Sequence, residues 1–369
     1  MFKILNEDKS ARVGILILNG RKVETPFFMP VATRGVGKYI GSDDYKEINS
    51  NAIICNSYIL SQNPGIEIIK KFGGIHRFMN YQDVIFSDCG GFQISRESFY
   101  VKTIDKGIVF KNLRTNKIEL LTPEKAIFIQ NAIGSDAIMA LDDMQAYGSN
   151  KEIFKKALKH TNNWALESLK YHNNNKQAIF GIIQGGFFKD LRLESAQFMT
   201  NQDFDGISIG GLAIGEKKEE MYKVLNWTLP IVNKKAKDKP HYLMGVGSPL
   251  DVLKCIGKGI DCFDSVYPTK NARHNTLFTW KGKIEINKQK YKNDKNPIDE
   301  QCKCLVCKNF TRAYIYYISK IDEPAAKRYK SIHNLFFMQE LLRKARIAIK
   351  EGEFNKFYKE FSKDYLNDN

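Results

Sequence analysis

Short apolar runs recur along the chain, and they constrain its fold more than any other feature of the sequence. Each run has four to six residues, and most of them end in glycine or a polar residue. Runs of this length are typical of strands that are buried on both faces of a parallel sheet. There are eight of them, at residues 28–32, 52–55, 84–87, 137–141, 178–183, 206–209, 241–244 and 262–266.

Stretches with helical spacing of apolar residues lie between several of the runs. Residues 152–172 show this spacing, and residues 248–259 begin at Ser248, a favoured helix N-cap. Strands alternating with helices predict an α/β fold, an irregular eight-stranded β/α barrel similar to a TIM barrel. The alternative is a doubly wound open sheet. That fold would be expected to carry a glycine-rich fingerprint after its first strand, and the sequence has none there.

Two segments break the alternation. Residues 93–122 alternate apolar and polar side chains like antiparallel strands, and we expect an insertion there. Residues 281–369 are basic, contain three closely spaced cysteines, and include a predicted helix over 323–352 that ends at a glycine. We therefore predict a catalytic barrel domain over 1–280, and a basic zinc-binding subdomain with closing helices over 281–369.

The net charge of the chain is +16, and the excess is uneven. Residues 281–369 hold 20 Lys and Arg against 12 Asp and Glu. Such a surplus favours a polyanionic partner, most simply nucleic acid. A generally lysine-rich composition would give the same signal, so charge alone leaves the partner open.

The remaining composition indicates a soluble, cytoplasmic protein. No apolar run approaches the roughly 18 residues of a membrane span, and the first residues lack the long apolar centre of a signal peptide. Four of the seven cysteines are scattered singly, which indicates a reducing compartment rather than a disulfide scaffold. We expect no membrane association.

The other three cysteines lie in the stretch CKCLVC, and they predict a metal site. Cys302, Cys304 and Cys307 are followed 26 residues later by His333, on the predicted C-terminal helix. Zn²⁺ favours such a Cys3His set, and four protein ligands leave no open position, so we expect one structural zinc ion. The alternative is three reduced thiols and an unrelated histidine.

Carboxylates and glycines follow several of the apolar runs. Asp88, Asp142, Asp143 and Asp264 stand at such positions, where the active sites of β/α barrels are built. Three other runs end in polar and glycine-rich segments, at residues 184–186, which begin with Gln184, at 210–216 and at 244–247. Carboxylates together with a glutamine suit the donor-rich edge of a guanine. Each of these residues alone could also be a helix cap or a turn residue.

The motifs SDCGGFQ, GIIQGG, GGLAIGE, YLMGVG and FDSVYPTKNAR, together with the Cys3His set, resemble those of the tRNA-guanine transglycosylases, also called queuine tRNA-ribosyltransferases. The matches run in order from residue 25 to His333. The resemblance implies an irregular β/α barrel with a zinc-binding subdomain. It also implies an enzyme, a glycosyltransferase of queuosine biosynthesis or salvage, that replaces the wobble guanine of certain tRNAs with a 7-deazaguanine.

The resemblance also implies roles for individual residues. Asp264 would be the nucleophile that forms a covalent ribosyl–enzyme intermediate, Asp88 the acid/base, and Asn56 the residue that orients Asp264. The base would be bound by Asp88, Gly90, Gly91, Phe92, Asp142, Met144, Gln184, Gly211, Leu212 and Met244. The anticodon loop would be bound by Gly245, Val246, Gly247, Ser248, Pro249, Leu250, Asp251, Thr269, Lys270, Asn271, Ala272 and Arg273.

The expected partners are the tRNAs for aspartate, asparagine, histidine and tyrosine, which have G-U-N anticodons, and a free 7-deazaguanine base. The family resemblance also suggests a homodimer. Bacterial members use the aminomethyl precursor of queuosine, and eukaryotic members use queuine.

Three residues depart from the bacterial pattern of the family: Cys89 replaces a serine, Ile59 a histidine and Met144 a cysteine. The Met144 position lies near the 7-substituent of the base in the family, and LDD before it resembles the eukaryotic type. We therefore hypothesise that the chain accepts queuine as well as, or instead of, the aminomethyl base; the alternative is a neutral exchange of side chains.

Three other functions stay open from the sequence: a partner subunit of the same family that lacks chemistry, a zinc-ribbon RNA binder, and an archaeal relative that makes the archaeosine precursor. The presence of Asp264 and Asp88 argues against the first. The archaeal type usually carries further RNA-binding domains after the barrel, and we do not expect this chain to be of that type.

Overall fold

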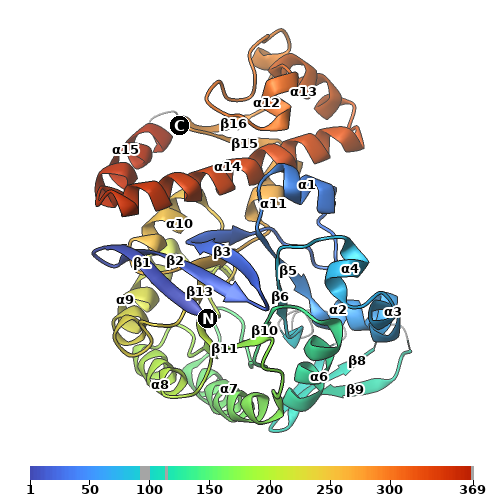
Figure 1. Cartoon of the computed structure of the whole chain (residues 1–369), viewed down its shortest axis with the longest axis vertical. Coiled ribbons are helices and arrows are strands. Elements are labelled where there is room, and N and C mark those ends of the chain that lie inside the picture. The colour runs from blue at the N-terminus through green and yellow to red at the C-terminus, as the bar shows by residue number, and fades with distance from the viewer. Residues whose placement is uncertain (92–99, 113–114, 367–369) are drawn as a thin grey trace.

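Eight parallel strands form the centre of the molecule (Figure 1). The computed structural model describes residues 1–91, 100–112 and 115–366. The hydrogen-bonded order is β4-β14-β13-β12-β11-β10-β6-β5, and a parallel bridge between Val31 and Ile54 joins the two end strands. The sheet thus closes into a barrel, which confirms the predicted fold and excludes the open sheet. Its strands are β4 (Phe27–Met29), β5 (Ala52–Asn56), β6 (Val84–Asp88), β10 (Ala137–Met139), β11 (Ala178–Ile183), β12 (Gly206–Ile209), β13 (His241–Leu243) and β14 (Cys262–Asp264).

Each of the eight apolar runs corresponds to one of these strands. The strands are apolar on both faces because one face fills the barrel and the other packs under helices. The helices α7 (Lys151–Tyr171) and α10 (Pro249–Ile256) confirm the two helices predicted between strands. The other helical segments of the barrel are α1 (Ser42–Glu47), α2 (Ser57–Leu60), η1 (Ser61–Gly65), α3 (Ile66–Lys71), α4 (Ile75–Met79), α6 (Pro123–Ile133), α8 (Lys189–Thr200), α9 (Lys218–Lys235) and α11 (Tyr267–Arg273).

An N-terminal antiparallel sheet, which the sequence analysis missed, precedes the barrel. It consists of β1 (Phe2–Asp8), β2 (Ala11–Leu18) and β3 (Arg21–Thr25). Leu16, Leu18 and Val23 from this sheet belong to the same apolar cluster as the side chains that fill the barrel. The sheet therefore closes one end of the barrel and leaves the other end for the site.

The described part of the predicted insertion is a second antiparallel sheet. Strands β7 (Tyr100–Ile104), β8 (Gly107–Lys111) and β9 (Ile118–Leu121) pair in sequence order, as the alternating pattern predicts. Residues 93–99 and 113–114 of the segment lie outside the described residues.

The C-terminal segment packs on the barrel through one long helix. Figure 1 shows α14 (Pro324–Lys350) crossing between the barrel and the segment that carries the three cysteines. Gln339 donates to the Phe28 carbonyl at 3.0 Å, and Arg346 donates to the Pro26 carbonyl at 2.7 Å, so α14 is tied to the start of β4. The other elements here are β15 (Thr276–Thr279), β16 (Gly282–Glu285), η2 (Gln289–Tyr291), α12 (Leu305–Asn309), α13 (Arg312–Lys320) and α15 (Phe354–Leu366).

The helix predicted over residues 323–352 is confirmed as α14, with Gly352 shortly after its end. Among the described residues, no helix is both long and apolar enough to cross a membrane.

Candidate active site and metal site

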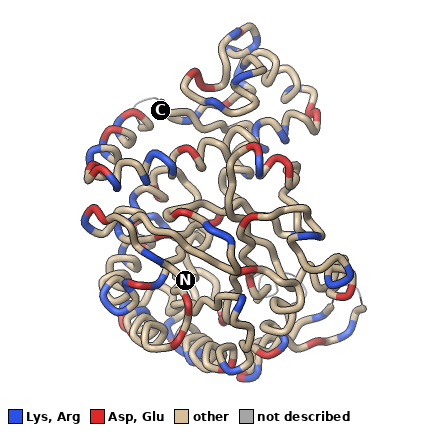
Figure 2. The backbone as a smooth tube through the Cα atoms, viewed as in Figure 1, with Lys and Arg blue, Asp and Glu red and all other residues tan. Residues whose placement is uncertain are grey.

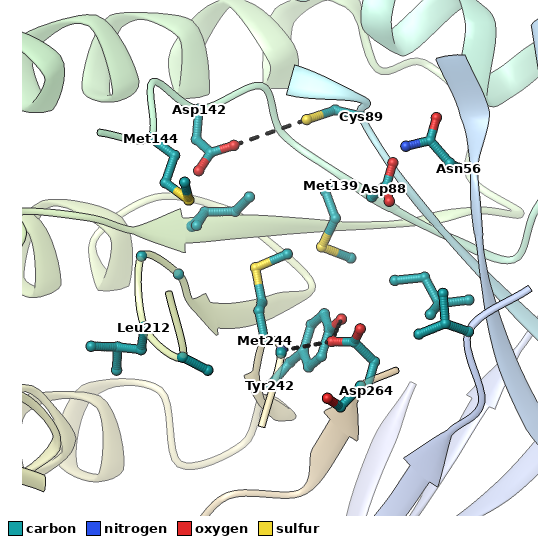
Figure 3. Close-up of a pocket in the computed structure, with 18 of the residues that line it drawn as sticks. Asn56, Asp88, Cys89, Met139, Asp142, Met144, Leu212, Tyr242, Met244 and Asp264 are labelled. Atoms are coloured by element: carbon teal, nitrogen blue, oxygen red, sulfur yellow. Dashed lines mark hydrogen bonds between the residues drawn. The ribbon is translucent and has the colours of Figure 1, made fainter. Parts of the chain in front are cut away.

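A cavity of about 320 Å³ opens where the barrel strands end (Figure 3). The strand-end residues singled out in the sequence meet there, although they are scattered over more than 200 positions. Gly91 is buried beside the cavity without lining it, and Phe92 lies outside the described residues. The predicted residues that line the cavity are Asn56, Asp88, Gly90, Asp142, Met144, Gln184, Gly211, Leu212, Met244 and Asp264.

Asp264 is the last residue of β14, and two donors hold one of its oxygens. The Tyr242 hydroxyl donates to Asp264 Oδ1 at 2.6 Å, and the Gly245 N–H donates to the same atom at 2.9 Å. Burial raises the pKa of Asp264 above its usual range, while both hydrogen bonds act in the opposite direction. The carboxylate is therefore fixed in orientation, and Oδ2 accepts no hydrogen bond from the described residues.

Tyr242 was missed by the sequence analysis. It lies inside an apolar run and is fully buried, so it was counted with the strand core. A buried tyrosine hydroxyl usually finds a polar partner, and that expectation was the signal available in the sequence.

Asp88 ends β6 across the cavity from Asp264 (Figure 3). The Gly90 N–H donates to Asp88 Oδ1 at 3.0 Å. Gly90 has a φ of +82°, and a Cβ there would lie 2.3 Å from Tyr58 Cβ, so this turn requires glycine.

Asn56 stands beside Asp88 in the β5–β6 register, and its side chain caps α2. Its Oδ1 accepts from the Ile59 N–H at 2.7 Å. Its buried Nδ2 has no hydrogen-bond partner among the described residues, so it does not bond to Asp264. The groups that orient Asp264 in this structure are Tyr242 and Gly245.

Asp142 and Gln184 form a hydrogen-bonded pair on a third side of the cavity. Gln184 Nε2 donates to Asp142 Oδ2 at 2.6 Å, and Cys89 Sγ lies 4.0 Å from Asp142 Oδ1. Burial raises the pKa of Asp142 to about 6, with a smaller contribution from Asp143 and opposition from the Gln184 hydrogen bond. The pair offers carboxylate acceptors and an amide to a flat ligand that carries N–H groups.

Arg192, on α8, supports this side of the cavity and was also missed. Its guanidinium is fully buried and donates to the carbonyls of Gly186 at 2.6 Å, Ile183 at 3.0 Å and Gly210 at 2.9 Å. These carbonyls belong to the ends of β11 and β12. Gly211 follows with a φ of +66°, and a Cβ there would lie 2.5 Å from Gln184 Oε1.

The residues assigned to the anticodon loop divide into two groups. Asp251 is held by α9, because its buried carboxylate accepts from the Tyr222 hydroxyl at 2.6 Å and pairs with Lys218. Val246, Gly247, Pro249 and Ala272 are buried as well. Exposed or half-buried positions are Gly245, Ser248, Leu250, Thr269, Lys270, Asn271 and Arg273.

Cys302, Cys304, Cys307 and His333 converge as one cluster, with their ligand atoms within 4.8 Å of one another. The three Sγ atoms lie 3.7, 3.5 and 3.4 Å from His333 Nδ1. A tetrahedral zinc ion with Zn–S of about 2.3 Å and Zn–N of about 2.0 Å requires a distance of about 3.5 Å between each sulfur and the nitrogen. The cluster therefore fits a zinc ion.

The second ring nitrogen of His333, Nε2, also has a hydrogen-bond partner. The Phe278 carbonyl lies 2.7 Å from His333 Nε2, which fixes Nδ1 as the nitrogen that faces the thiols.

A closed barrel with several strand-end carboxylates around one cavity is the architecture of a β/α-barrel enzyme. Residues 7–367 match the family model described as queuine tRNA-ribosyltransferase. Among relatives named queuine tRNA-ribosyltransferase, the protein of Thermoanaerobacter sp. (strain X514) is 42% identical over 99% of this chain and 97% of its own length. The relative from Enterococcus faecalis is 40% identical over 99% and 96%, and that from Fusobacterium nucleatum is 39% identical over 99% and 98%. The chain belongs to the queuine tRNA-ribosyltransferase family.

Proposed function

We propose that this protein exchanges the wobble guanine of tRNAs with G-U-N anticodons for a 7-deazaguanine, through a covalent ribosyl–Asp264 intermediate. The observation that supports this most directly is the placement of Asp264 and Asp88 around one cavity, with the Asp142–Gln184 pair on a third side. Figure 3 shows the three carboxylates.

The first step uses the oxygen of Asp264 that the protein leaves open. Asp264 Oδ2 attacks C1′ of the ribose and forms a C–O bond, while the C1′–N9 bond to guanine breaks and its electron pair stays on the base. A proton from Asp88 neutralises the departing guanine. In the second step Asp88 accepts a proton from the incoming base, whose N9 displaces Asp264 from C1′. Two displacements replace one difficult step, as in retaining glycosidases.

Recognition of the base falls to the Asp142–Gln184 side of the cavity. Asp142 accepts from the paired N–H groups of a guanine-like edge, and Gln184 supplies an amide donor and acceptor. Backbone groups of Gly211 and Leu212 face the same space. Met244 covers one face of the ring, and Met144 borders the position of the 7-substituent.

The pKa of Asp142 makes base binding dependent on pH. Since burial raises this pKa to about 6, the carboxylate is ionised above that value and protonated below it. We expect the dissociation constant for free guanine to rise below about pH 6, approaching about tenfold per pH unit. Equilibrium titration of the wild type and of Asp142→Asn checks this. A wild-type affinity that is constant from pH 5 to 8, or a variant that keeps the dependence, would contradict it.

The C-terminal segment is proposed to serve tRNA binding. Figure 2 shows Lys and Arg along this part of the chain, and it is tied to the barrel by α14. We propose that residues 281–369 act as a subdomain stabilised by one structural zinc ion. Lys270 and Arg273 approach the tRNA from the neighbouring helix α11. We further propose that the protein works as a homodimer in the cytoplasm.

Exchange of labelled guanine into tRNAs for aspartate, asparagine, histidine and tyrosine tests the proposal as a whole. We expect incorporation into all four, and none into a tRNA whose wobble guanine is replaced by adenine. Binding of tRNA with no exchange under any condition would overturn it in favour of an RNA-binding protein without chemistry.

The identity of the incoming base is a separate prediction, which depends on Met144. This side chain is 9% exposed and lines the cavity beside Asp142 (Figure 3), where the bacterial pattern has a smaller, more polar cysteine. We expect incorporation of queuine at a rate within about tenfold of that for the aminomethyl base. Parallel assays with both labelled bases measure this, and Met144→Cys is expected to shift preference toward the aminomethyl base. Exclusive use of the aminomethyl base by the wild type would contradict it.

A further inference from the structure

The segment 140–146 carries part of the cavity wall, yet within this described stretch it forms neither helix nor strand. Side chains of α7 hold it instead. Ser168 Oγ accepts from the Leu141 N–H at 3.4 Å, and Thr161 Oγ1 accepts from the Asp143 N–H at 3.0 Å. The position of the base-reading side chains therefore depends on this helix.

Asp142 and Asp143 are neighbours whose carboxylates point in opposite directions. Asp142 lines the cavity, whereas Asp143 is 4% exposed and faces α7. Asp143 Oδ2 lies 2.7 Å from His160 Nδ1, and its Oδ1 accepts from Gln145 Nε2 at 2.6 Å. The strongest link between the segment and the helix is thus a buried carboxylate–imidazole contact.

His160 has a carboxylate on each side. Its Nε2 lies 3.1 Å from Asp105 Oδ1, in the turn between β7 and β8, and its ring stacks on Trp164 at 5.4 Å between centroids. Trp164 Nε1 also donates to the Asp105 carbonyl at 2.6 Å. Because a carboxylate only accepts hydrogen bonds, the buried contact is made when Nδ1 carries the proton and donates to Asp143 Oδ2.

We propose that His160 is a positioning residue for base recognition, which donates a hydrogen bond to the buried Asp143 and fixes segment 140–146 so that Asp142 points into the cavity. The inference rests on the proposed function, because it takes Asp142 as the residue that reads the base. His160 touches neither base nor ribose, and it acts through Asp143.

Loss of the imidazole would leave Oδ2 of the buried Asp143 without its hydrogen-bond donor, beside a second carboxylate. An unpaired buried charge is strongly unfavourable, so the segment is expected to turn Asp143 toward solvent and move Asp142 with it. The contact of His160 with Asp105 stabilises the arrangement less, because the Asp105 side chain is 94% exposed and even an ion pair in water contributes little stability. The Asp143 side of the contact is therefore the one that matters for the base.

Steady-state exchange assays on the full-length, zinc-loaded protein test this proposal. For His160→Ala we expect the KM for the free base to rise about tenfold, with the KM for tRNA and kcat at saturating base changed by less than about twofold. His172→Asn, at the end of the same helix, is the matched control, and Asp105→Asn should also stay within about twofold of the wild type.

The Asp143→Asn, His160→Ala double variant separates positioning from packing. Removing the uncompensated charge is expected to restore much of the affinity for the base, whereas a loss of helix packing would not be rescued. An unchanged KM for the base in His160→Ala would overturn the inference, as would a double variant no better than the single one. Failure of the proposed function looks different: the wild type itself would then show no exchange.

Discussion

Asp264→Asn is expected to abolish base exchange, with a loss of roughly a thousandfold or more in kcat. An amide oxygen is too weak a nucleophile to attack C1′, and no other carboxylate of the described residues is held at the same position. Release of labelled guanine from tRNA measures the first step directly. It should vanish together with the complete exchange.

The variant is expected to keep its fold, because the side-chain amide has the shape of the carboxylate. Its Oδ1 can still accept from Tyr242 and from the Gly245 N–H, so the hydrogen bonds that hold the side chain survive. Zinc content, melting temperature and tRNA affinity should therefore match the wild type. Asp203→Asn is the matched control, since this exposed carboxylate precedes β12 at the opposite end of the barrel.

A second measurement tests whether the intermediate is covalent. Wild-type protein mixed with tRNA and denatured without added base should retain a fraction of the RNA in a protein–RNA adduct, and Asp264→Asn should retain none. Substantial exchange by the variant, or an adduct that survives the substitution, would assign the nucleophile to another residue.

The barrel was predictable because its signal is local. A strand buried on both faces must be apolar throughout, so runs such as residues 178–183 appear without knowledge of their neighbours. In the N-terminal sheet, β1 and β3 are partly exposed and mix polar with apolar residues, so their pattern is weak. The middle strand β2 is mostly buried, and its apolar residues 13–18 were a local signal that was overlooked. The closing role of the sheet depends on contacts of Leu16 and Val23 with strands far away in the sequence.

The candidate site also has a part that the sequence predicts and a part that it does not. Carboxylates at strand ends can be read from the sequence, because the end of an apolar run predicts where a barrel places its active site. The side chains that hydrogen-bond to these carboxylates, or to the backbone around them, could not be predicted from the sequence. Tyr242, Arg192 and His160 look like core or surface residues until the structure shows the oxygens they contact. Asn56 was expected to orient Asp264, and its side chain instead caps α2.

His333→Ala is the second variant with a large expected effect, because it removes one corner of the metal site. We expect zinc content to fall from one equivalent to well below half, since three thiolates alone hold the ion less tightly at neutral pH. Metal analysis after gel filtration measures this. His274→Ala is the matched control, as this exposed histidine stands outside the cluster.

The C-terminal segment should lose stability along with the metal. In zinc-finger peptides a structural zinc ion contributes an apparent binding free energy of about 10–16 kcal/mol at neutral pH. We expect residues near Cys302–Cys307 to lose protection from hydrogen exchange, and the same result from chelation of the wild type. Retention of one equivalent of zinc by the variant would place the fourth ligand elsewhere.

Loss of zinc is expected to affect the tRNA more than the base, because α14 is bonded to the barrel through side chains other than the metal ligand. The helix carries His333 near its middle. Gln339 lies about two turns later and Arg346 about four turns later, and they donate to the Phe28 and Pro26 carbonyls. Those bonds hold β4, the neighbour of the strand that ends in Asp264. They do not depend on the metal, so the affinity for free guanine should persist in zinc-free protein. The affinity for tRNA should fall, because the basic segment that carries Cys302–Cys307 is then no longer fixed against α14 and the barrel.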